Sequence, residues 1–513
     1  MNQSFHILST MEASILEQAC AFTSLALLIF YLVTSIYCIY FHPLSAFPGP
    51  TWATFSRLPL ASKTISGRTH TWIEHLHAKY GPIVRIAPDE LSTVSAEAWS
   101  DIYKPKHSLP KDPYSLLPPL NGAHSLFTAQ GAEHRRLRRT LTPAFTEKAL
   151  TQQASIIESY VDLFVDRLRR ETTTTKGESI NITKYLGFVA LDIISDLAFG
   201  ESFHGIEGSN DHNWIEGFFL GAKFGNIRNC LNHFHPFEVL FGMLFLRLTA
   251  KNRARNWALT DANVNKRLEM GDSGQLRFDF MTPCIDNIGP NTITRRELNS
   301  NSLGFIIAGS QLPTIMLSTA IYQLLRNPRA LSRLVQEVRT SFVAEDEITI
   351  SSTKRLPYLR AIIMETLRLE HPAPTQLARV VPPQGHVVAD RCIPGNAVIG
   401  MAIHAVQRSR LHWNDPDGFH PERFLNPEHS YHDPRYGADN KDSFHPFSMG
   451  SRHCIGYKVV LAEARVLLAR ICWSFELSLD VNTPVNWMDK RSFLVVEAKP
   501  LFVKLRERSS QLR

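Results

Sequence analysis

The sequence predicts a mainly α-helical domain with small β-sheets, preceded by a single N-terminal transmembrane helix. Helical periodicity dominates the chain, most clearly over residues 151–170, 298–325 and 358–369. Two short runs of strand-forming residues interrupt it. Residues 83–94 flank Pro88 and Asp89, and residues 391–403 flank Pro394 and Gly395, so each run predicts a β-hairpin. The transmembrane helix is predicted from residues 18–41, which carry no charge and exceed the roughly 20 apolar residues that cross a bilayer.

The flanks of this uncharged stretch predict how the chain crosses the membrane. Glu12 and Glu17 precede it without any Lys or Arg, unlike the basic start of a cleaved signal peptide. The first basic residues, Arg57, Lys63 and Arg68, follow it, and positive charge stays on the cytosolic side. We therefore expect residues 1–18 to be a short luminal N-terminus, 19–41 the transmembrane helix, 42–50 a Pro-rich hinge and 51–513 one cytosolic domain.

Composition limits the classes of protein to which this domain can belong. The 513 residues are 44% hydrophobic and contain neither an internal repeat nor a low-complexity linker, which favours one large domain. Seven cysteines, an odd number without a C-x-x-C pair, argue against a disulfide framework and a zinc site and predict a reducing compartment. No G-x-G-x-x-G follows a strand and no phosphate-binding loop occurs, so a partner would have to bind any nicotinamide or flavin nucleotide.

The most informative segment is residues 447–456, where one cysteine lies between two glycines. Gly450 lets the backbone turn sharply and approach a flat macrocycle, and Gly456 lets the following helix lie close to it. The start of that helix points N–H groups and its positive dipole end at the sulfur of Cys454, which favours a thiolate. Phe447 can cover one face of the macrocycle, and Arg452 offers donors to a carboxylate. A buried free cysteine is the ordinary alternative, but it explains none of these four neighbours.

Two further motifs precede this segment. Glu365 and Arg368 lie three residues apart in the helical run 358–369 and therefore share one face of the helix. Arg423 follows within the sequence P-E-R-F at 421–424. A single surface pair like the first would contribute little by itself.

With these three motifs in this order, the chain resembles the cytochrome P450 superfamily over nearly its whole length, from residue 48 to the closing strands near residue 502. The resemblance implies the P450 fold and a haem-thiolate catalytic domain at 51–513. It also implies a haem b group whose iron takes the Cys454 thiolate as axial ligand, a ligand that favours O–O cleavage. Arg423 would join Glu365 and Arg368 in a buried structural triad that locks the scaffold beneath the haem.

Residues 41–50, 192–200 and 322–328 resemble fungal microsomal members, in particular the isotrichodermin hydroxylase type of secondary metabolism. This resemblance implies an anchor in the endoplasmic reticulum membrane and a lipophilic substrate such as a terpenoid or polyketide. It also implies electrons from NADPH-cytochrome P450 reductase, with cytochrome b5 as an optional second donor. NADPH and flavin would then act only through the reductase, and no nucleic acid is expected.

The basic run 134–139, with the net charge of +7 and a pI near 9.0, could also suggest nucleic-acid binding or nuclear targeting. The resemblance offers another interpretation. In the family this position is a helix that binds a haem propionate through a W-x-x-x-R motif. Here His134 stands where Trp is usual, and Arg138 is the Arg of the motif. A His N–H can still donate to a carboxylate. The other arginines of the run, Arg135, Arg136 and Arg139, would face outward and attract an acidic reductase. For Arg135 and Arg139 a merely solvated helix face is the alternative. Arg379 resembles the family's other propionate-binding arginine.

The distal helix departs from the family pattern Ala/Gly-Gly-x-Asp/Glu-Thr, whose acid and alcohol relay protons to oxygen. By the same resemblance, Ala308 and Gly309 would keep the side of the helix next to the haem free of large side chains, so that oxygen can bind there. Gln311 cannot give up a proton as an acid does, and Leu312 has no hydroxyl. The relay segment formed by Gly309, Ser310, Gln311 and Leu312 is therefore degenerate.

Three other proton sources remain open. Pro313 lacks an N–H and so leaves the carbonyl of Gly309 free to bind a water. Ser310 or a hydroxyl of the substrate could also serve. Thr314 is two residues beyond Leu312, which turns its side chain by roughly 200 degrees, so we do not expect it to substitute directly.

By resemblance, residues 218–248 would form a lid over an apolar distal pocket and touch the membrane, since they are rich in Phe and Leu with few acids. Ordinary helix core is the alternative for any one of them. The positions implied to line the pocket are Leu117, Phe127, Phe305, Ala308, Leu312 and Gln376.

Three functions are consistent with this sequence. The first is a monooxygenase that hydroxylates or epoxidises a lipophilic small molecule with O2 and reductase electrons. The second is an isomerase, dehydratase or rearrangement enzyme of the same fold, which would need no proton relay to oxygen and so tolerate Gln311 and Leu312. The third is a non-enzymatic haem-binding protein, which would have no use for a face that docks a reductase.

Overall fold

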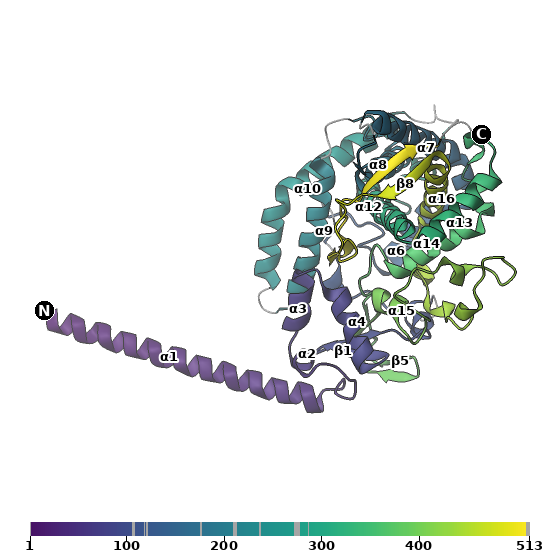
Figure 1. Ribbon diagram of the computed structural model, residues 1–513. Coiled ribbons are helices and arrows are strands. Elements are labelled where there is room, and N and C mark those ends of the chain that lie inside the picture. Colours follow the sequence, from purple (N-terminus) through teal and green to yellow (C-terminus); the bar gives the residue numbers. More distant parts are fainter. Residues whose placement is uncertain are drawn as a thin grey trace.

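The structure is a computed structural model. It describes residues 2–104, 108–116, 118–119, 122–174, 177–208, 213–234, 238–270, 277–285 and 287–508, with the backbone alone for 2–16, 20, 27, 213–220 and 222. One long helix at the N-terminus projects from a body made mostly of helices, in which the strands form small separate sheets (Figure 1). The predicted fold class is confirmed.

Helices account for most of the described chain. Their bounds are α1 Asn2–Ile36, α2 Thr51–Phe55, α3 Leu58–Ile65, α4 Thr69–Tyr80, α5 Ala98–Tyr103, α6 Gly131–Leu141, α7 Glu147–Thr174, α8 Ile182–Phe199, α9 Asn213–Leu231, α10 Glu238–Glu269, α11 Thr282–Ile285, α12 Arg295–Arg326, α13 Pro328–Ser341, α14 Pro357–Leu369, α15 Ile403–Arg408 and α16 Tyr457–Ser474. The three helical runs predicted from the sequence correspond to α7, α12 and α14, each somewhat longer than its prediction.

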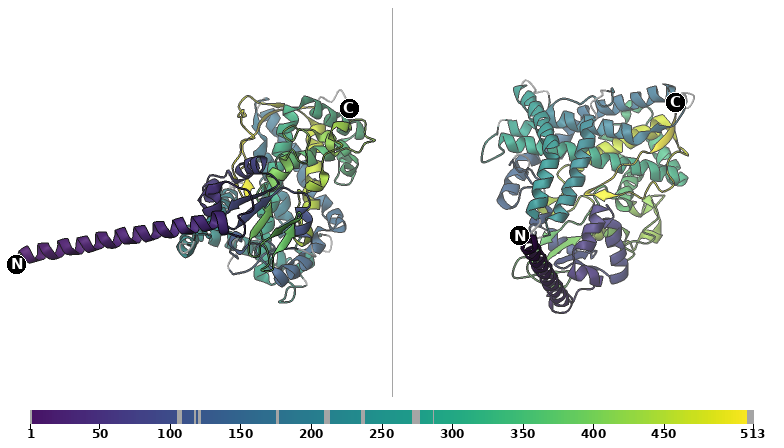
Figure 2. Two further views of the ribbon diagram at one scale, coloured as in Figure 1. Left: turned by 90° about the horizontal axis from the view of Figure 1, so that it is seen from below. Right: turned by 90° about the vertical axis from the view of Figure 1, so that its left-hand side faces the viewer.

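The N-terminal helix begins at Asn2 and passes into a π-helical turn, Tyr37–Phe41. Residues Glu17–Phe41, which include this turn, are apolar and long enough to cross a membrane. Their most apolar part is not buried in the body, whereas Cys38 of the turn is buried. The chain turns at His42, where the backbone becomes extended. α1 leaves the body on the side where α9 and α10 lie (Figure 2). Among the described residues α12 is also long and apolar, but it is mostly buried, as befits a core helix.

The largest sheet has four strands in the order β1-β2-β7-β4. The strand bounds are β1 Ile83–Ala87, β2 Glu90–Thr93, β3 Ile180–Asn181, β4 Arg379–Val380, β5 His386–Val388, β6 Arg391–Ile393, β7 Val398–Met401, β8 Phe475–Leu479, β9 Ser492–Phe493, β10 Val495–Val496 and β11 Phe502–Glu507. β1 and β2 pair antiparallel from Ile83 with Thr93 to Ala87 with Glu90, so the first predicted hairpin is confirmed.

The second predicted hairpin, at 391–403, is wrong. Both of its strands exist, but β6 pairs with β5, whereas β7 pairs parallel with β2 and antiparallel with β4. The chain between them crosses from one sheet to another because its backbone bonds to the segment before β5: Asn396 N–H donates to Val381 O at 2.9 Å, and Val381 N–H to Ala397 O at 2.8 Å. Gly395 permits this approach, since a Cβ there would lie 2.1 Å from Pro383 O.

α12 runs through the main core and packs most extensively against α8. A capping box starts α12: the Thr294 hydroxyl accepts from Glu297 N–H at 3.3 Å, and the Glu297 carboxylate accepts from Thr294 N–H at 2.8 Å. α8 ends at Gly200, whose φ of 79° is left-handed, as helix-ending glycines often are. A second apolar cluster joins the four-stranded sheet to α4, α5 and α15. α12 is thereby fixed in the main core by its packing against α8.

Candidate active site

Cys454 lies just before α16, after a single 3₁₀ turn at Gly450–Arg452. Its N–H donates to Phe447 O at 2.9 Å, which closes the loop. Burial raises the pKa of the Cys454 thiol, while hydrogen bonds from the N–H groups of Gly456 and Tyr457 oppose the rise. The side chain nevertheless keeps accessible surface. A sulfur that is deep in the protein and still accessible faces an internal space rather than packed core.

The glycines and Phe447 shape the loop around this sulfur. Gly450 has a φ of 75°, and a Cβ there would lie 1.8 Å from Tyr103 O, so only glycine fits the turn against α5. A Cβ at Gly456 would meet only Phe145, at 3.9 Å, which leaves room beside the first turn of α16. The ring of Phe447 lies 5.9 Å from that of Tyr457, on the surface side of the loop.

Five basic side chains converge near this loop without an acid. They are Lys111, His134, Arg138, Arg379 and Arg452, and none forms an ion pair with any carboxylate in the described part of the chain. Burial, together with the charges of Arg452 and Arg379, lowers the pKa of Lys111 to about 7. Burial and the same cations lower the pKa of His134 to about 4. The Nε of Arg379 is buried and has no hydrogen-bond partner among the described residues.

Buried cations without counter-charges destabilise a protein unless an anion joins them. The two propionates of a haem would be anions of the required kind, and Cys454 would hold the haem iron as its thiolate. The residues present therefore fit a haem-thiolate group. His134, Arg138, Arg379 and Arg452 lie together near this loop, and their binding of the propionates stays a prediction. Arg138 also donates to His453 O at 2.8 Å and Arg452 to Ala129 O at 3.1 Å.

One face of α12 borders an internal space. Gly304, Ala308 and Leu312, at four-residue intervals, are only half-buried, whereas most of the helix around them is fully buried. Phe127 covers the start of this face, because a Cβ at Gly304 would lie 2.7 Å from its ring. Of the other pocket positions, Gln376 lines a separate cavity and Leu117 lies outside the described residues. Phe305 lies on the same side of α12 but is buried, and packs against Phe145 and Phe280 with ring centroids 5.4 and 5.7 Å away.

The absence of a side chain at Gly309 also matters for helix packing, while its predicted place beside the haem stays a prediction. A Cβ at this position would lie 2.4 Å from the side chain of Ile194, so the glycine allows α12 to approach α8. Thr314 also faces α8, since it lies 3.9 Å from the Cβ position of Gly187, and its hydroxyl donates to Ser310 O at 2.6 Å. It therefore does not replace the missing alcohol. The hydroxyl of Ser310 is committed as well, donating to Ile306 O at 2.7 Å.

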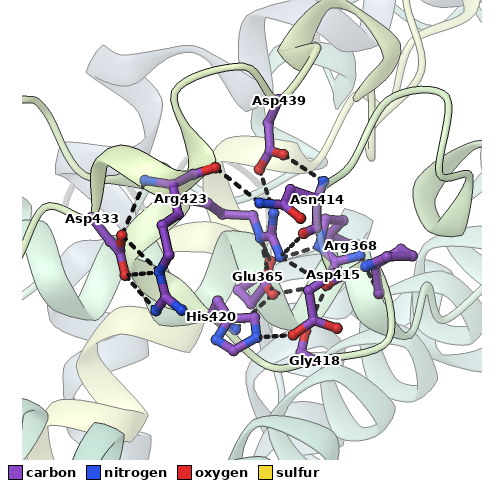
Figure 3. Close-up of polar contacts among 11 residues, drawn as sticks. Glu365, Arg368, Asn414, Asp415, Gly418, His420, Arg423, Asp433 and Asp439 are labelled. Atoms are coloured by element: carbon purple, nitrogen blue, oxygen red, sulfur yellow. Dashed lines mark hydrogen bonds and ion pairs between the residues drawn. The ribbon is translucent and has the colours of Figure 1, made fainter.

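Glu365, Arg368 and Arg423 meet in one buried cluster (Figure 3). Arg368 donates to both carboxylate oxygens of Glu365, at 2.7 and 2.8 Å, and Arg423 Nε donates to the same carboxylate at 3.2 Å. Arg423 also donates to Asp439 (Figure 3). Two cations and two anions thus neutralise one another. The remaining N–H groups of Arg368 donate to backbone carbonyls, including that of Pro416 at 2.8 Å, in the loop that leads toward Cys454.

The cytochrome P450 family model matches residues 47–505 of this chain. The chain belongs to the cytochrome P450 family. Averantin hydroxylase of Dothistroma septosporum is 36% identical over 488 residues, which cover 94% of this P450 and 90% of the relative. The cytochrome P450 monooxygenase atr2 of Stereocaulon alpinum is 34% identical over 485 residues, 92% and 94% of the two chains. The cytochrome P450 monooxygenase lcsI of Purpureocillium lilacinum is 33% identical over 494 residues, 95% and 93%.

These matches decide among the three functions that the sequence left open. The protein is a cytochrome P450 monooxygenase, an oxidoreductase whose family implies a haem-thiolate cofactor. Neither the rearrangement enzyme nor the non-enzymatic haem protein gains support from any of these relatives.

Two members of the site were missed by the sequence analysis. Asp439 balances the triad, but it lies in a loop with no motif of its own, and only the fold brings it to Arg423. Lys111 reaches the cation cluster because it forms an isolated β-bridge with Arg379. A lone lysine in a loop gives no signal in a single sequence, whereas its pairing with the strand of Arg379 is plain in the structure.

Proposed function

We propose that this P450 inserts one atom of dioxygen into a lipophilic secondary metabolite, a terpenoid or polyketide, by hydroxylation or epoxidation. The haem, when bound, supplies the activation of dioxygen. The observation that carries the proposal is the Cys454 thiol, which faces an internal space with two backbone N–H groups directed at its sulfur. The accessible face of α12 is apolar at Gly304, Ala308 and Leu312, which suits a lipophilic substrate.

Deletion of the gene in its source organism tests this proposal directly. We expect the deletion strain to lose a product and to accumulate a precursor that is lighter by one oxygen atom. An accumulated isomer, or a difference of one water, would instead indicate rearrangement or dehydration. Restoring the gene with Cys454→Ala should fail to restore the product, whereas a copy with Cys392→Ala, which changes an exposed cysteine on β6, should restore it.

Protons would come from a water bound at Gly309 O or from a hydroxyl of the substrate. Ser310 is poorly placed as a donor because its O–H already points at Ile306 O. Leu312→Thr should raise the fraction of NADPH that ends in product if a water carries the protons, since it restores an alcohol on the accessible face. Leu312→Val is the matched control, having the shape of Thr without its hydroxyl. Equal coupling in the two variants would count against the water relay.

Electrons would come from an NADPH-dependent reductase that docks beside the cysteine loop. A groove of about 440 Å³ lies there between α14, the loop and α16, lined by Arg360, Arg465 and His453 over an apolar floor that includes Met364. The exposed Arg135 and Arg139 of α6 add further positive charge to the surface. Basic surfaces of this kind attract acidic partners.

Charge reversal tests this docking face. Arg360→Glu should raise the concentration of reductase needed for half-maximal turnover about tenfold at low salt, and the difference should shrink at high salt because salt screens exposed charges. Arg506→Glu, on the exposed side of β11, is the control. Equal effects of the two substitutions would show that total charge, and not this face, governs the reductase.

We further propose that α1 anchors the P450 in the endoplasmic reticulum membrane, with the domain in the cytosol and α10 resting on the bilayer. The first half of α10 exposes a row of large apolar side chains: Val239, Leu240, Met243, Leu244, Leu246 and Leu248. Exposed apolar surface of this extent is typical of a membrane or protein contact. A tag at the C-terminus should remain with microsomes after alkaline washing and be removed by added protease. A protected tag would reverse the proposed orientation.

A further inference from the structure

A second cavity, of about 190 Å³, lies between α3, α4, α9, β1 and β9. It is smaller than the roughly 300 Å³ at which pockets begin to hold a whole ligand, so it suits one part of a larger molecule. Leu60, Ile73 and Ile86 make part of its wall apolar. The wall also includes Gln376, three residues before the propionate-site Arg379, so the cavity adjoins the segment that borders the haem site.

Three side chains that line this cavity carry a buried polar atom without a hydrogen-bond partner in the described part of the chain. The atoms are His70 Nδ1, Gln376 Oε1 and Ser492 Oγ. Buried polar atoms are nearly always hydrogen-bonded in native proteins, because leaving one unpaired costs free energy. The three come from segments far apart in the sequence, and the fold brings them to one small cavity. A polar group of a ligand would satisfy them.

Gln376 defines which kind of polar group is needed. Its amide nitrogen donates to Glu90 Oε1 at 3.2 Å and to Leu91 O at 3.1 Å. The carbonyl of Leu91 can only accept, so the amide must place its nitrogen there and its oxygen elsewhere. Arg57 fixes Glu90 in turn, donating to Glu90 Oε2 at 2.9 Å. Both donors of Gln376 are therefore used, and its oxygen is an acceptor that requires an O–H or N–H from the ligand.

The other two atoms complete the pattern. Ser492 is 4% exposed, its backbone N–H is bonded to Gly67 O at 2.9 Å, and its hydroxyl is left to donate or accept. Burial lowers the pKa of His70 to about 3, so its imidazole is neutral. It lies edge-on against His404 with ring centroids 5.0 Å apart. A neutral imidazole and a hydroxyl pair with a neutral ligand group and do not select an ion.

We propose that this cavity is a recognition subsite for an alcohol or phenol hydroxyl of the substrate. A hydroxyl donates to Gln376 Oε1 and can accept from Ser492 or His70, whereas a ketone, ether or methoxy group leaves Gln376 Oε1 unpaired. The inference deepens the proposed function and rests on it, in that the ligand is taken to be the substrate of the monooxygenase. The substrate would then already carry a hydroxyl, placed by an earlier hydroxyl-forming reaction, when it reaches this P450.

A matched pair of probes tests the subsite in the full-length, haem-loaded protein. The probes are 2,6-dihydroxynaphthalene and 2,6-dimethoxynaphthalene, which share a ring system and differ in their ability to donate. Their affinities are measured by calorimetry, so that binding away from the haem is also detected. We expect the diol to bind about tenfold more tightly, because the ether leaves a buried acceptor unpaired.

Two variants should abolish most of this preference. Ser492→Ala removes only the hydroxyl, and Gln376→Met removes the acceptor while keeping the length of the side chain. Ser318→Ala, a buried serine whose hydroxyl bonds within α12, should leave the preference unchanged. Equal binding of the two probes, or an undiminished preference in both variants, would overturn the proposal.

The outcome for the subsite is separable from the outcome for the proposed function. Oxygen insertion that depends on NADPH, without a preference for the diol, would defeat the subsite alone. A preference for the diol that disappears in Ser492→Ala, in a protein that gives no oxygenated product with any substrate, would defeat the proposed function alone.

Discussion

Replacing Glu463 by Gln should raise the free energy of unfolding of the P450 above neutral pH. It should also remove the part of the pH dependence of that free energy that comes from the Glu463 carboxyl. Glu463 lies on α16, nine residues after Cys454, and is 3% exposed. Its Oε1 has no hydrogen-bond partner among the described residues. Burial raises the pKa of this carboxyl from 4.5 to about 8. The native protein therefore keeps a proton that the unfolded chain releases.

The sign and size of the effect follow from this difference. Between pH 4.5 and about 8 the unfolded state binds fewer protons at this site than the native state, so stability falls as pH rises. The slope is about 1.4 kcal/mol per pH unit, which gives on the order of 3 kcal/mol between pH 5 and pH 8. Glutamine has the shape of the protonated acid and no proton to lose. Glu463→Gln should therefore exceed the free energy of unfolding of the parent by less than about 1 kcal/mol at pH 5 and by about 4 kcal/mol at pH 8.

Urea unfolding followed by circular dichroism at pH 5, 6, 7 and 8 measures this difference. The control is Glu428→Gln, which changes an exposed acid and should leave the pH dependence of the parent intact. Parallel curves for the parent and Glu463→Gln would refute the reasoning, because they would mean that Glu463 binds no extra proton in the native state.

Three further predictions concern the scaffold and the haem site. Glu365→Gln leaves two buried guanidiniums without their shared carboxylate and should lower the free energy of unfolding by about 3–5 kcal/mol, seen as an earlier urea midpoint. Gly309→Ala places a Cβ 2.4 Å from Ile194 and should destabilise by about 1–3 kcal/mol; in thermal melting, the double variant with Ile194→Ala should lose less stability than the two single variants together. Arg379→Met should stabilise the haem-free protein, since it removes a buried unpaired cation, yet release haem to a scavenger protein about tenfold faster.

Much of the fold and of the haem site could be predicted because the information is local. The β1–β2 hairpin is specified by a turn between two short strands, and α14 by its own periodicity. Glu365 and Arg368 need only three residues of helix to reach one another at 2.7 Å. The turn at Gly450 requires a positive φ that glycine supplies. In each case the residues that interact are close in sequence, so a motif can record the contact.

The errors arise where contacts join distant segments. The segment at 394–397 looks like a hairpin turn, but its bonds to Val381 direct the chain into another sheet. No motif predicts the close approach of Gly309 to Ile194 of α8, where a Cβ would lie 2.4 Å away. Phe305 is apolar and suitably spaced, yet it packs with Phe145 in the core. A single sequence shows a residue and its neighbours along the chain. It does not show which distant residue the folded chain brings into contact with it.

A hydroxylated substrate would explain both the loss of the proton relay on α12 and the unpaired polar atoms of the second cavity. Thr314 faces α8 and the hydroxyl of Ser310 points at its own helix, so no alcohol of this segment is free on the accessible face of α12. A substrate that is held by one hydroxyl at Gln376 is by nature a hydroxylated molecule, and a second hydroxyl near α12 would supply the proton that Leu312 does not. Leu312 then adds apolar surface to the pocket without loss of the relay. On this hypothesis, the effect of Leu312→Thr on the fraction of NADPH that ends in product depends on the second hydroxyl, the one near α12. The substitution should raise this fraction more when that hydroxyl is replaced by a methoxy group, because such a substrate has no proton to donate there.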